Sequence, residues 1–356
     1  MRVLITGCCG FVGTSVAETL AGQQSGLALH GADNFIRSGV HLNRSRFERV
    51  GGRFWHADLR NASDLDALPA VDWVIDAAAN PSVLGGIDGR SSVRQVVEHN
   101  LVGTVNVLEY CRRHGAGLIL LSTSRVYSIP ALAGLRLEVA GTRFKLVEHA
   151  ALPAGLTSAG INERFSTAAP ISLYGATKLS SEVLALEYGR TFGFPVWINR
   201  CGVLAGAGQF GTAEQGIFSY WLHAWRTPRR LRYIGFEGRG FQVRDAFHPR
   251  DLTVVLAQQL SDPGEPDADR TFNLGGGLEG SMSLAELSAW CVERFGPRPV
   301  DADLTPRSFD LPWIVMDSAQ ACARWDWRPR LALHQILGEI ADHAEQNPGW
   351  LEVCRA

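Results

Sequence analysis

The sequence predicts an α/β protein, in which a doubly wound parallel sheet with helices on both faces is followed by a smaller C-terminal lobe. Three observations support this prediction. Short apolar runs alternate with helical patterns over the first 200 residues, which is the rhythm of right-handed βαβ units. A glycine-rich turn directly follows the first run. Beyond residue 201, glycine-rich loops, aromatic residues and short helices replace the alternation. We therefore expect a sheet domain at residues 1–200 and a lobe at residues 201–356, from which one strand or helix can return to the sheet.

The expected strands are short and largely apolar, as in parallel sheets whose strands are buried on both faces. Helices are expected at 10–22, just after residue 59, at 92–115, and from Tyr174 onward. The residues at 128–169 show little periodicity, and a gap of this length is typical either of disorder or of a functional covering loop. The strands are expected at 2–6 (RVLIT), 27–33 (LALHGAD), 52–59 (GRFWHADL), 72–79 (DWVIDAAA), 117–124 (GLILLSTS) and 194–201 (FPVWINRC).

The composition limits the classes of protein that this chain can belong to. Of its 356 residues, 46% are hydrophobic and 20% are charged, so a large core is expected and disorder is not. The net charge of −2 argues against nucleic-acid binding, which needs a basic face. No apolar run reaches the length of a membrane span, and the chain opens directly on a strand with no signal-peptide layout. The seven cysteines include no C-x-x-C pair and no zinc spacing, which predicts reduced thiols in a cytoplasmic protein.

The glycine-rich turn predicts a dinucleotide site. Gly7, Gly10 and Gly13 lie between the first strand and the first helix, where a tight turn, a close approach of the backbone to a pyrophosphate and close helix packing each exclude a Cβ. Asp33 ends the second strand 20 residues after Gly13. A carboxylate there accepts hydrogen bonds from the adenosine ribose and repels a 2′-phosphate. This Rossmann-type pattern favours NAD over NADP, although Arg37 could reach a phosphate.

A tyrosine and a lysine one helical turn apart predict the reacting groups. Tyr174 and Lys178 follow a loop rich in proline, glycine and serine. An ammonium near the phenol, together with a cationic nicotinamide, favours the phenolate, which can take a proton from a sugar hydroxyl. A hydroxyl cluster at the end of the fifth strand, Ser122 to Ser124, can bind the same substrate oxygen. The spacing alone is common on helix surfaces, so the interpretation depends on the dinucleotide-binding half that precedes it.

These motifs carry a resemblance to a known family. The glycine turn, STSRVY, SLYGATK, FQVRDAFHPRDL and FNLGGG resemble the extended short-chain dehydrogenase/reductase family that modifies nucleotide sugars, over nearly the whole chain. The resemblance implies that Thr123 is the catalytic hydroxyl, Tyr174 the acid/base, and Lys178 its partner and a ligand of the nicotinamide ribose. The expected cofactor-binding residues are Gly7, Gly10, Phe11, Val12, Gly13, Asp33, Asn34, Asp58, Leu59, Ala77, Ala78, Ala79, Asn100, Tyr174 and Lys178.

Two of these expected cofactor-binding residues, Asp58 and Asn100, can be interpreted further. Asp58 ends the third strand, where a carboxylate can accept from the adenine amino group or serve only as a turn or helix cap. Asn100, Gly103 and Thr104 match an Asn-x-x-Gly-Thr pattern that the family places at the substrate edge of the sheet. The stretch DAAAN also departs from the family, because Asp76 and Asn80 stand where relatives often have His and Gln.

The residues after Thr123 indicate which reaction to expect. Family members that eliminate water at sugar C5/C6 carry an acidic pair directly after the catalytic Thr, whereas this chain has Ser124 and Arg125. The expected reaction is therefore epimerisation, in which the sugar is transiently oxidised to a ketone and reduced on its other face. The cofactor ends unchanged, so we expect NAD to be held tightly.

A narrower similarity suggests the substrate. INRCGVLAGAGQFGTAEQGIFSYW, RYIGFEGRGFQVRDAFH and NERFSTAAPISLYGATK look like the CDP-tyvelose/CDP-paratose 2-epimerase branch. The similarity favours C2 of a CDP-hexose. Arg244 is expected to bind the pyrophosphate, the alternative being an ion pair with Asp245, and His248 is expected to be structural or to orient the substrate. The expected substrate-binding residues are Asn80, Ser124, Asn199, Gln209, Gln215, Arg244 and His248.

Two alternatives remain open at this point. One is a UDP-sugar 4-epimerase that uses the same residues with the sugar turned differently. The other, from a different class, is a non-catalytic NAD-binding regulatory protein, which the presence of both Tyr174 and Lys178 argues against. The family resemblance also implies a homodimer, paired through the long helix near Asn100 and the helix after Tyr174.

Overall fold

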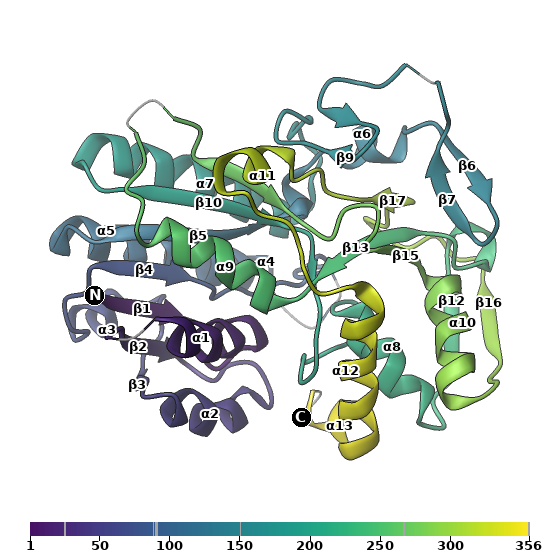
Figure 1. Ribbon diagram of the computed structural model, residues 1–356, viewed down its shortest axis with the longest axis horizontal. Coiled ribbons are helices and arrows are strands. Elements are labelled where there is room, and N and C mark those ends of the chain that lie inside the picture. Colours follow the sequence, from purple (N-terminus) through teal and green to yellow (C-terminus); the bar gives the residue numbers. More distant parts are fainter. Residues whose placement is uncertain (25, 88, 90–91, 150, 266–267, 355–356) are drawn as a thin grey trace.

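A seven-stranded parallel sheet forms the centre of the protein, in the order β14-β10-β5-β4-β1-β2-β3 (Figure 1). This computed structural model describes residues 1–354 except 25, 88, 90–91, 150 and 266–267. The predicted fold class, a Rossmann-type doubly wound sheet, is confirmed. The strands are β1 (Arg2–Thr6), β2 (Ala28–Asp33), β3 (Arg53–His56), β4 (Trp73–Asp76), β5 (Gly117–Thr123), β10 (Val196–Cys201) and β14 (Thr271–Leu274).

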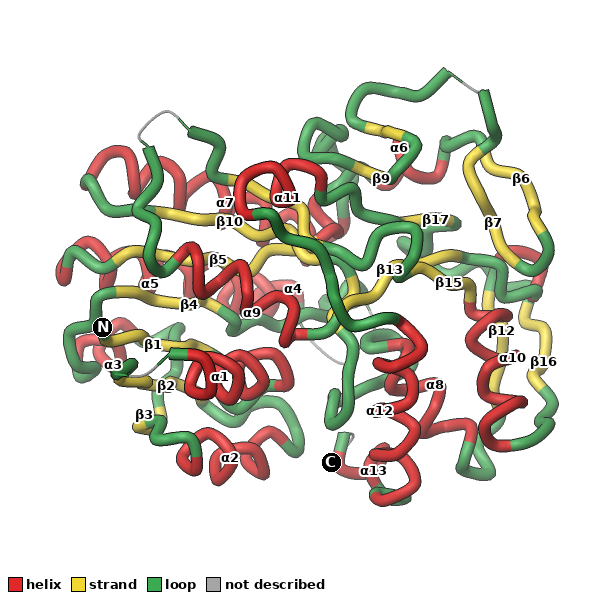
Figure 2. The backbone as a smooth tube through the Cα atoms, in the orientation of Figure 1, coloured by secondary structure: helices red, strands yellow, loops and turns green. Residues whose placement is uncertain are grey.

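Helices cover both faces of this sheet, as the alternating pattern predicts (Figure 2). Along β1, Val3 and Ile5 belong to one hydrophobic cluster and Leu4 to the other, because successive side chains of a strand point to opposite faces. The first face is covered by α1 (Phe11–Gln23), α9 (Pro249–Gln259) and α11 (Ala319–Trp325). The second is covered by α3 (Ala62–Asp66), α5 (Gly103–His114) and α7 (Ser172–Phe192). The short helices η1 (Val40–Asn43) and α2 (Arg44–Arg49) follow β2.

The long helix expected at 92–115 is interrupted by one wide turn. It consists of α4 (Val93–Val97), a π-helical turn η2 (Glu98–Val102) and α5, and it ends at Gly115 with a left-handed φ of 62°. Asn100 lies in the π turn and is 2% exposed. Single π turns within helices are often found at functional sites, and this one aims an amide side chain at the loop after β4.

The residues at 128–169, which had no predicted structure, form short elements that pack against the C-terminal lobe. Leu132 and Phe165 from this segment share one hydrophobic cluster with Trp313 and Met316. The segment, of which residue 150 is not described, is therefore a folded extension rather than a loose cover. The short helix η3 (Ser124–Val126) precedes the segment, whose own elements are α6 (Ile129–Ala133) and the hairpins β6 (Leu137–Ala140) with β7 (Arg143–Leu146) and β8 (Leu156–Thr157) with β9 (Gly160–Ile161).

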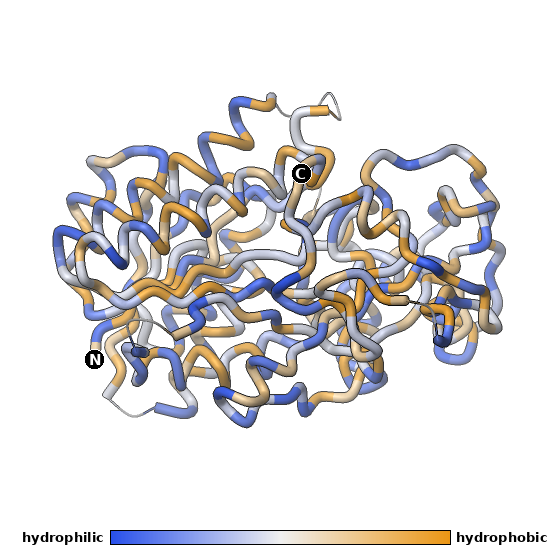
Figure 3. The backbone as a smooth tube through the Cα atoms, turned by 90° about the horizontal axis from the view of Figure 1, so that it is seen from above, coloured by the Kyte–Doolittle hydropathy of each residue, from blue (hydrophilic) through white to orange (hydrophobic). Residues whose placement is uncertain are grey.

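The C-terminal lobe is built on a small mixed sheet with helices packed beside it. In the hydropathy view, apolar positions lie along the strands of the large sheet and alternate with polar ones along the helices around it (Figure 3). The C-terminal half also returns to the large sheet, to which it contributes β14, α9 and α11. The lobe contains β11 (Val203–Leu204), α8 (Ile217–Trp225), β12 (Leu231–Ile234), η4 (Phe236–Gly238), β13 (Val243–Phe247), β15 (Ser281–Ser283), α10 (Leu284–Phe295), β16 (Val300–Asp303), β17 (Trp313–Ile314), α12 (Leu333–Gln346) and α13 (Trp350–Val353).

No helix in the described part of the chain combines the length and the apolar character that crossing a bilayer requires. All seven cysteines are free thiols.

A pair of amide side chains joins β10 to α9 inside the core. Asn199 and Gln259 are both 0% exposed. The Asn199 Nδ2 donates to Gln259 Oε1, and the Gln259 Nε2 donates to Asn199 Oδ1, each at 2.9 Å. Since both amides are satisfied by each other, Asn199 has a structural role in this fold.

Replacing Asn199 by leucine would leave the Gln259 amide unpaired in the core. We expect Asn199→Leu to lower the free energy of unfolding by about 1–3 kcal/mol, measured by urea unfolding followed by circular dichroism. The double variant Asn199→Leu/Gln259→Leu removes both partners, so it should lose less stability than the two single variants added together. Strictly additive losses would show that the two amides are not coupled.

Candidate active site

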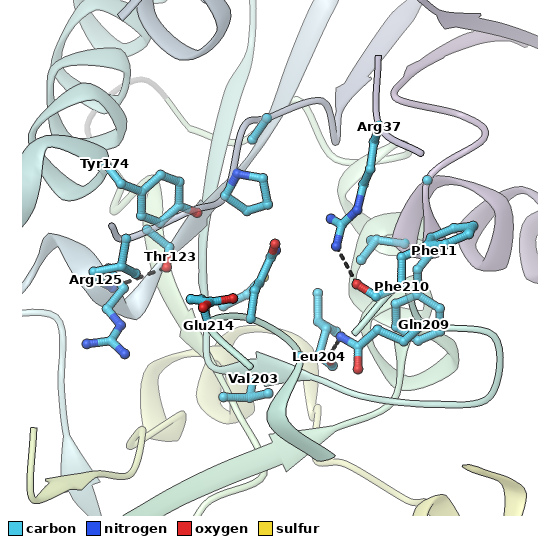
Figure 4. A pocket seen from close by; sticks show the side chains of 18 of the residues that line it. Phe11, Arg37, Thr123, Arg125, Tyr174, Val203, Leu204, Gln209, Phe210 and Glu214 are labelled. Atoms are coloured by element: carbon cyan, nitrogen blue, oxygen red, sulfur yellow. Dashed lines mark hydrogen bonds between the residues drawn. The ribbon is translucent and has the colours of Figure 1, made fainter. Parts of the chain in front are cut away.

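A cavity of about 460 Å³ lies where the carboxyl ends of the central strands meet the C-terminal lobe (Figure 4). In parallel α/β sheets, ligands bind at this edge. The cavity collects most of the predicted residues from positions far apart in the sequence. Those that line it are Gly7, Gly10, Phe11, Val12, Gly13, Asp33, Asn34, Asp58, Leu59, Ala77, Ala78, Ala79, Thr123, Ser124, Tyr174, Gln209, Gln215 and Arg244.

The glycine turn has the geometry that a bound pyrophosphate needs. Gly7 has a φ of +62°, and a Cβ there would lie 2.9 Å from the Cα of Ala78. A Cβ on Gly13 would lie 2.2 Å from the Gly7 carbonyl oxygen, so both positions require glycine. The N-terminus of α1 lines the cavity and has no side-chain cap. Its first amides and the positive end of the helix dipole are therefore suited to a phosphate.

Asp33 lies at the end of β2, as predicted, and lines the same cavity. Its carboxylate accepts hydrogen bonds from the backbone N–H groups of Cys9, at 3.1 Å, and Phe35, at 2.9 Å. Burial raises the pKa of this carboxyl group, while the two amides favour its charged form. The strand end thus presents an oriented acceptor, which suits the hydroxyls of a ribose.

Arg37 is turned toward the C-terminal lobe. Its guanidinium donates to the backbone carbonyl of Phe210 (dashed in Figure 4) and lies 5.9 Å from the centroid of that ring. One residue later, the Ser38 hydroxyl donates to the Val353 carbonyl at 2.8 Å. The loop after β2 is therefore fastened to the lobe by two side chains.

Asp58 already has charged and polar partners. Its carboxylate pairs with the Arg60 guanidinium at 2.6 Å and accepts from the Asn34 amide at 3.1 Å. The Arg60 hydrogen bonds hold the pKa of Asp58 well below its usual range. Asp58 therefore lines the cavity as an ionised group that also orders the turn after β3.

Thr123 and Tyr174 meet on the wall of the cavity. Thr123 ends β5 and Tyr174 lies in the first turn of α7, and in Figure 4 the phenol points into the cavity close to Thr123. Burial raises the pKa of Tyr174 to about 12, while a hydrogen bond with the Thr123 hydroxyl and the charge of Arg125 act in the opposite direction. The phenol is therefore protonated at neutral pH and lies close to the predicted hydroxyl.

Lys178 lies one turn after Tyr174, behind the cavity wall. It is 2% exposed. Burial lowers the pKa of its ammonium, and the carboxylates of Asp76 and Glu182 oppose this effect. Asp76 ends β4 and accepts from the Thr6 hydroxyl at 2.5 Å. Asp76, which stands where relatives often have His, thus places an acid near the buried lysine. The sequence position did not reveal this role.

Four other predicted residues lie behind the cavity lining. Asn100 Nδ2 donates to the Asn80 carbonyl at 3.0 Å, and its Oδ1 accepts from the Asn80 N–H at 2.7 Å, so it shapes the loop after β4. His248 caps α9, where its Nδ1 accepts from the Arg250 N–H at 3.0 Å. Burial lowers the pKa of His248 to about 4, so it is neutral at neutral pH. Asn199 is paired with Gln259, away from the predicted substrate site.

The remaining substrate candidates surround the lobe side of the cavity. Gln209 donates to the Leu204 carbonyl at 2.7 Å (Figure 4). Arg244 pairs with Asp310 at 3.0 Å rather than with its neighbour Asp245. The sequence analysis did not assign two further arginines of this wall, Arg125 and Arg307, because their proximity to Arg244 arises only in the folded chain.

Comparisons with known proteins agree with this site. A CDP-paratose 2-epimerase from Salmonella typhi is 27% identical over 355 residues, covering 96% of this chain and 98% of that protein. A dTDP-glucose 4,6-dehydratase from Streptomyces antibioticus is 27% identical over 364 residues, covering 99% of this chain and 95% of that protein. These relatives are named as an epimerase and a dehydratase, which leaves the alternative of a non-catalytic regulatory protein without support.

The fold is shared with a solved epimerase. The crystal structure of UDP-glucuronic acid 4-epimerase from Bacillus cereus, in complex with UDP-glucuronic acid and NAD, matches with a TM-score of 0.77 and 22% identity. The match covers 97% of this chain and 99% of that chain. NAD fits the observed cradle, because the glycine turn, the uncapped helix and Asp33 lie in the order that a dinucleotide needs. A model of the NAD dependent epimerase/dehydratase family matches residues 3–275, and the chain therefore belongs to this family, whose cofactor is NAD.

Proposed function

We propose that this protein epimerises a nucleotide-activated hexose by transient oxidation to a ketone, with C2 of a CDP-hexose as the favoured substrate position. The observation that carries the proposal is the meeting of Thr123 and Tyr174 on the wall of a cavity whose other side holds the dinucleotide cradle. A sugar carbon placed between this pair and the cradle can lose its hydroxyl proton to the pair and its carbon-bound hydrogen to the dinucleotide.

The side chains have separable roles in this proposal. Thr123 and Tyr174 bind the hydroxyl oxygen of the reacting carbon, and Tyr174 accepts and later returns its proton. Lys178, with Asp76 and Glu182 beside it, maintains a cation behind the phenol, which favours the phenolate. NAD, when bound, supplies a reversible acceptor for the hydrogen that leaves the carbon with its electron pair.

The residues after Thr123 favour epimerisation over elimination. Ser124 and Arg125 both line the cavity, and neither carries a carboxylate that could remove a proton from the neighbouring sugar carbon. The similarity to the dehydratase from Streptomyces antibioticus is as high as that to the epimerase from Salmonella typhi, so overall identity does not separate the two reactions. Ser124 and Arg125, which take the place of the acidic pair, favour epimerisation.

The choice of C2 and of a CDP-hexose has the support of the Salmonella typhi relative, named CDP-paratose 2-epimerase. The second candidate is a UDP-sugar 4-epimerase, which is supported by the fold shared with the Bacillus cereus enzyme. The two candidates use the same Thr123–Tyr174 pair and differ in how the sugar is turned toward it.

We also propose that the protein is a cytoplasmic homodimer. The outer face of η2 and α7 exposes apolar side chains, with Val102 39%, Val183 54% and Phe192 50% accessible. These two elements contact each other, so the three side chains belong to one helical layer. The seven free thiols suit a reducing compartment.

Replacing Tyr174 by phenylalanine removes the proton acceptor but leaves the ring in place. We expect Tyr174→Phe to lower kcat by roughly 10²–10⁴-fold while NAD stays bound, as measured by turnover assays and by the cofactor content of the purified protein. The control Tyr188→Phe removes a hydroxyl bonded to Glu109 at 2.8 Å, outside the cavity, and should leave turnover unchanged. Full activity in Tyr174→Phe would exclude its assigned role.

A panel of CDP-, UDP-, GDP- and dTDP-hexoses, scored by NMR for inverted products, tests the reaction. We expect inversion at C2 of a CDP-hexose, with deuterium placed at C2 returning to C2 of the product, because the hydrogen stays on the cofactor during turnover. Internal return of label at C4 of a UDP-hexose would establish the second candidate instead. Release of water with a 4-keto-6-deoxy product would contradict both.

A charge placed on the α7 face tests the dimer. We expect Val183→Glu to shift the protein to monomers in sedimentation velocity, because an ionised group is costly to bury in an apolar interface. Val139, on β6, is similarly accessible at 52%, and Val139→Glu is the matched control that should leave the assembly unchanged. A dimer that persists in Val183→Glu would place the interface elsewhere.

A further inference from the structure

Three arginines from distant parts of the sequence line one wall of the cavity. Arg125 follows the catalytic strand end, Arg244 lies on β13, and Arg307 belongs to the segment before β17. Arg125 is also tied to Thr123, because its backbone N–H donates to the Thr123 hydroxyl oxygen at 3.2 Å. One of the three arginines therefore belongs to the catalytic centre itself.

Neutral backbone groups and one carboxylate hold these guanidinium groups in place. Arg125 donates to the Phe309 carbonyl at 3.2 Å, and Arg307 donates to the Ala213 carbonyl at 3.1 Å. Within the described residues, Asp310 is the carboxylate in ion-pair contact with any of the three, through Arg244 at 3.0 Å. Glu214 also lines the cavity, but its side chain is exposed and makes no ion pair with them.

The three arginines of this wall differ in their charged neighbours. Arg244 has an ion-pair partner in Asp310 and also feels the charge of the buried Asp245, and the exposed Glu214 lies on the same cavity. Arg125 and Arg307, in contrast, have no carboxylate in ion-pair contact within the described residues. Burial lowers the pKa of Arg125 to about 10, and the neighbouring charges of Arg244 and Arg307 act in the same direction. Like charges placed close together away from bulk water are costly, so the wall is suited to an anion bound beside Arg125 and Arg307.

We propose that Arg125 is a substrate-binding residue, which joins Arg244 and Arg307 in holding the diphosphate of the nucleotide sugar and fixes it relative to Thr123. This inference rests on the proposed function, because it takes the substrate to be a nucleoside diphosphate attached to an uncharged hexose. A diphosphate supplies negative charge to the two arginines that have no carboxylate in ion-pair contact, and guanidinium groups bind phosphate oxygens as paired donors.

The contacts of Arg125 also connect binding to chemistry. Its side chain holds Phe309, whose φ is +58°, in the same segment that carries Arg307 and Asp310. Its backbone orients the hydroxyl that contacts Tyr174. An anion bound by Arg125 therefore fixes the diphosphate-binding segment and the catalytic threonine through one residue. Loss of this side chain is expected to affect kcat as well as affinity.

Calorimetric titration of the NAD-bound protein with CDP, UDP, CMP and UMP tests the assignment. We expect Arg125→Gln to weaken diphosphate binding by about tenfold or more, to change monophosphate binding much less, and to leave bound NAD in place. Arg125→Lys keeps the charge without the paired donors and should lie between the Gln variant and the wild type. The control Arg190→Gln removes an exposed arginine of α7 and should match the wild type.

Each other result has a definite meaning for Arg125. Unchanged diphosphate affinity in Arg125→Gln or Arg125→Lys, with NAD bound, would overturn the assignment. A nucleoside diphosphate hexuronic acid adds a sugar carboxylate to the diphosphate. If Arg125→Gln lowers the affinity for this ligand but leaves that for CDP and UDP unchanged, Arg125 binds the sugar carboxylate, and the assignment fails. If the Gln variant does not fold, the Lys variant decides. A wild type that binds CDP or UDP but inverts no sugar would refute the proposed function and leave this titration valid.

Discussion

The site depends on a lysine that is buried together with its counter-charges. Lys178 is almost fully enclosed, and an isolated ammonium in such a place would lose its proton. Asp76 and Glu182 oppose this loss, and each is held in turn: Asp76 by the Thr6 hydroxyl, and Glu182 by Ser122 and by Arg200 at 2.7 Å. These partners come from the ends of β1, β4, β5 and β10. The order of strands in the sheet therefore determines whether α7 can carry its lysine at all.

The two sides of the cavity have opposite electrostatic character. On the sheet side, two ionisable groups are already compensated, with Asp58 paired to Arg60 and Lys178 set among acids. On the lobe side, Arg244 is paired with Asp310, whereas Arg125 and Arg307 have no carboxylate in ion-pair contact in the part of the chain that the structure describes. In the function proposed here, the lobe side binds the diphosphate of the nucleotide sugar, and the sheet side acts on the sugar of the same molecule.

The sequence was sufficient for those features that depend on local spacing. Glycine positions in a strand–turn–helix, an acid at a strand end and a tyrosine–lysine turn fix geometry over a few residues, so Gly7, Asp33, Thr123 and Tyr174 all lie at the cavity. Features that depend on contacts between distant segments were not accessible. Asn199 resembles a strand-end ligand until Gln259, 60 residues later, is placed against it. The π turn at Asn100, the hairpins within 128–169 and the partners of Arg125 likewise arise only when separate segments pack together.

Two hydrogen bonds tie the loop after β2, which borders the dinucleotide cradle, to the C-terminal lobe. Arg37 and Ser38, which adjoin the adenosine side of the cradle, are bound to Phe210 and to Val353 near the C-terminus. A loop tied to the lobe at two points is restrained from moving away from the cradle. For an enzyme that regenerates its dinucleotide in every cycle, such a restraint favours retention of the cofactor between turnovers.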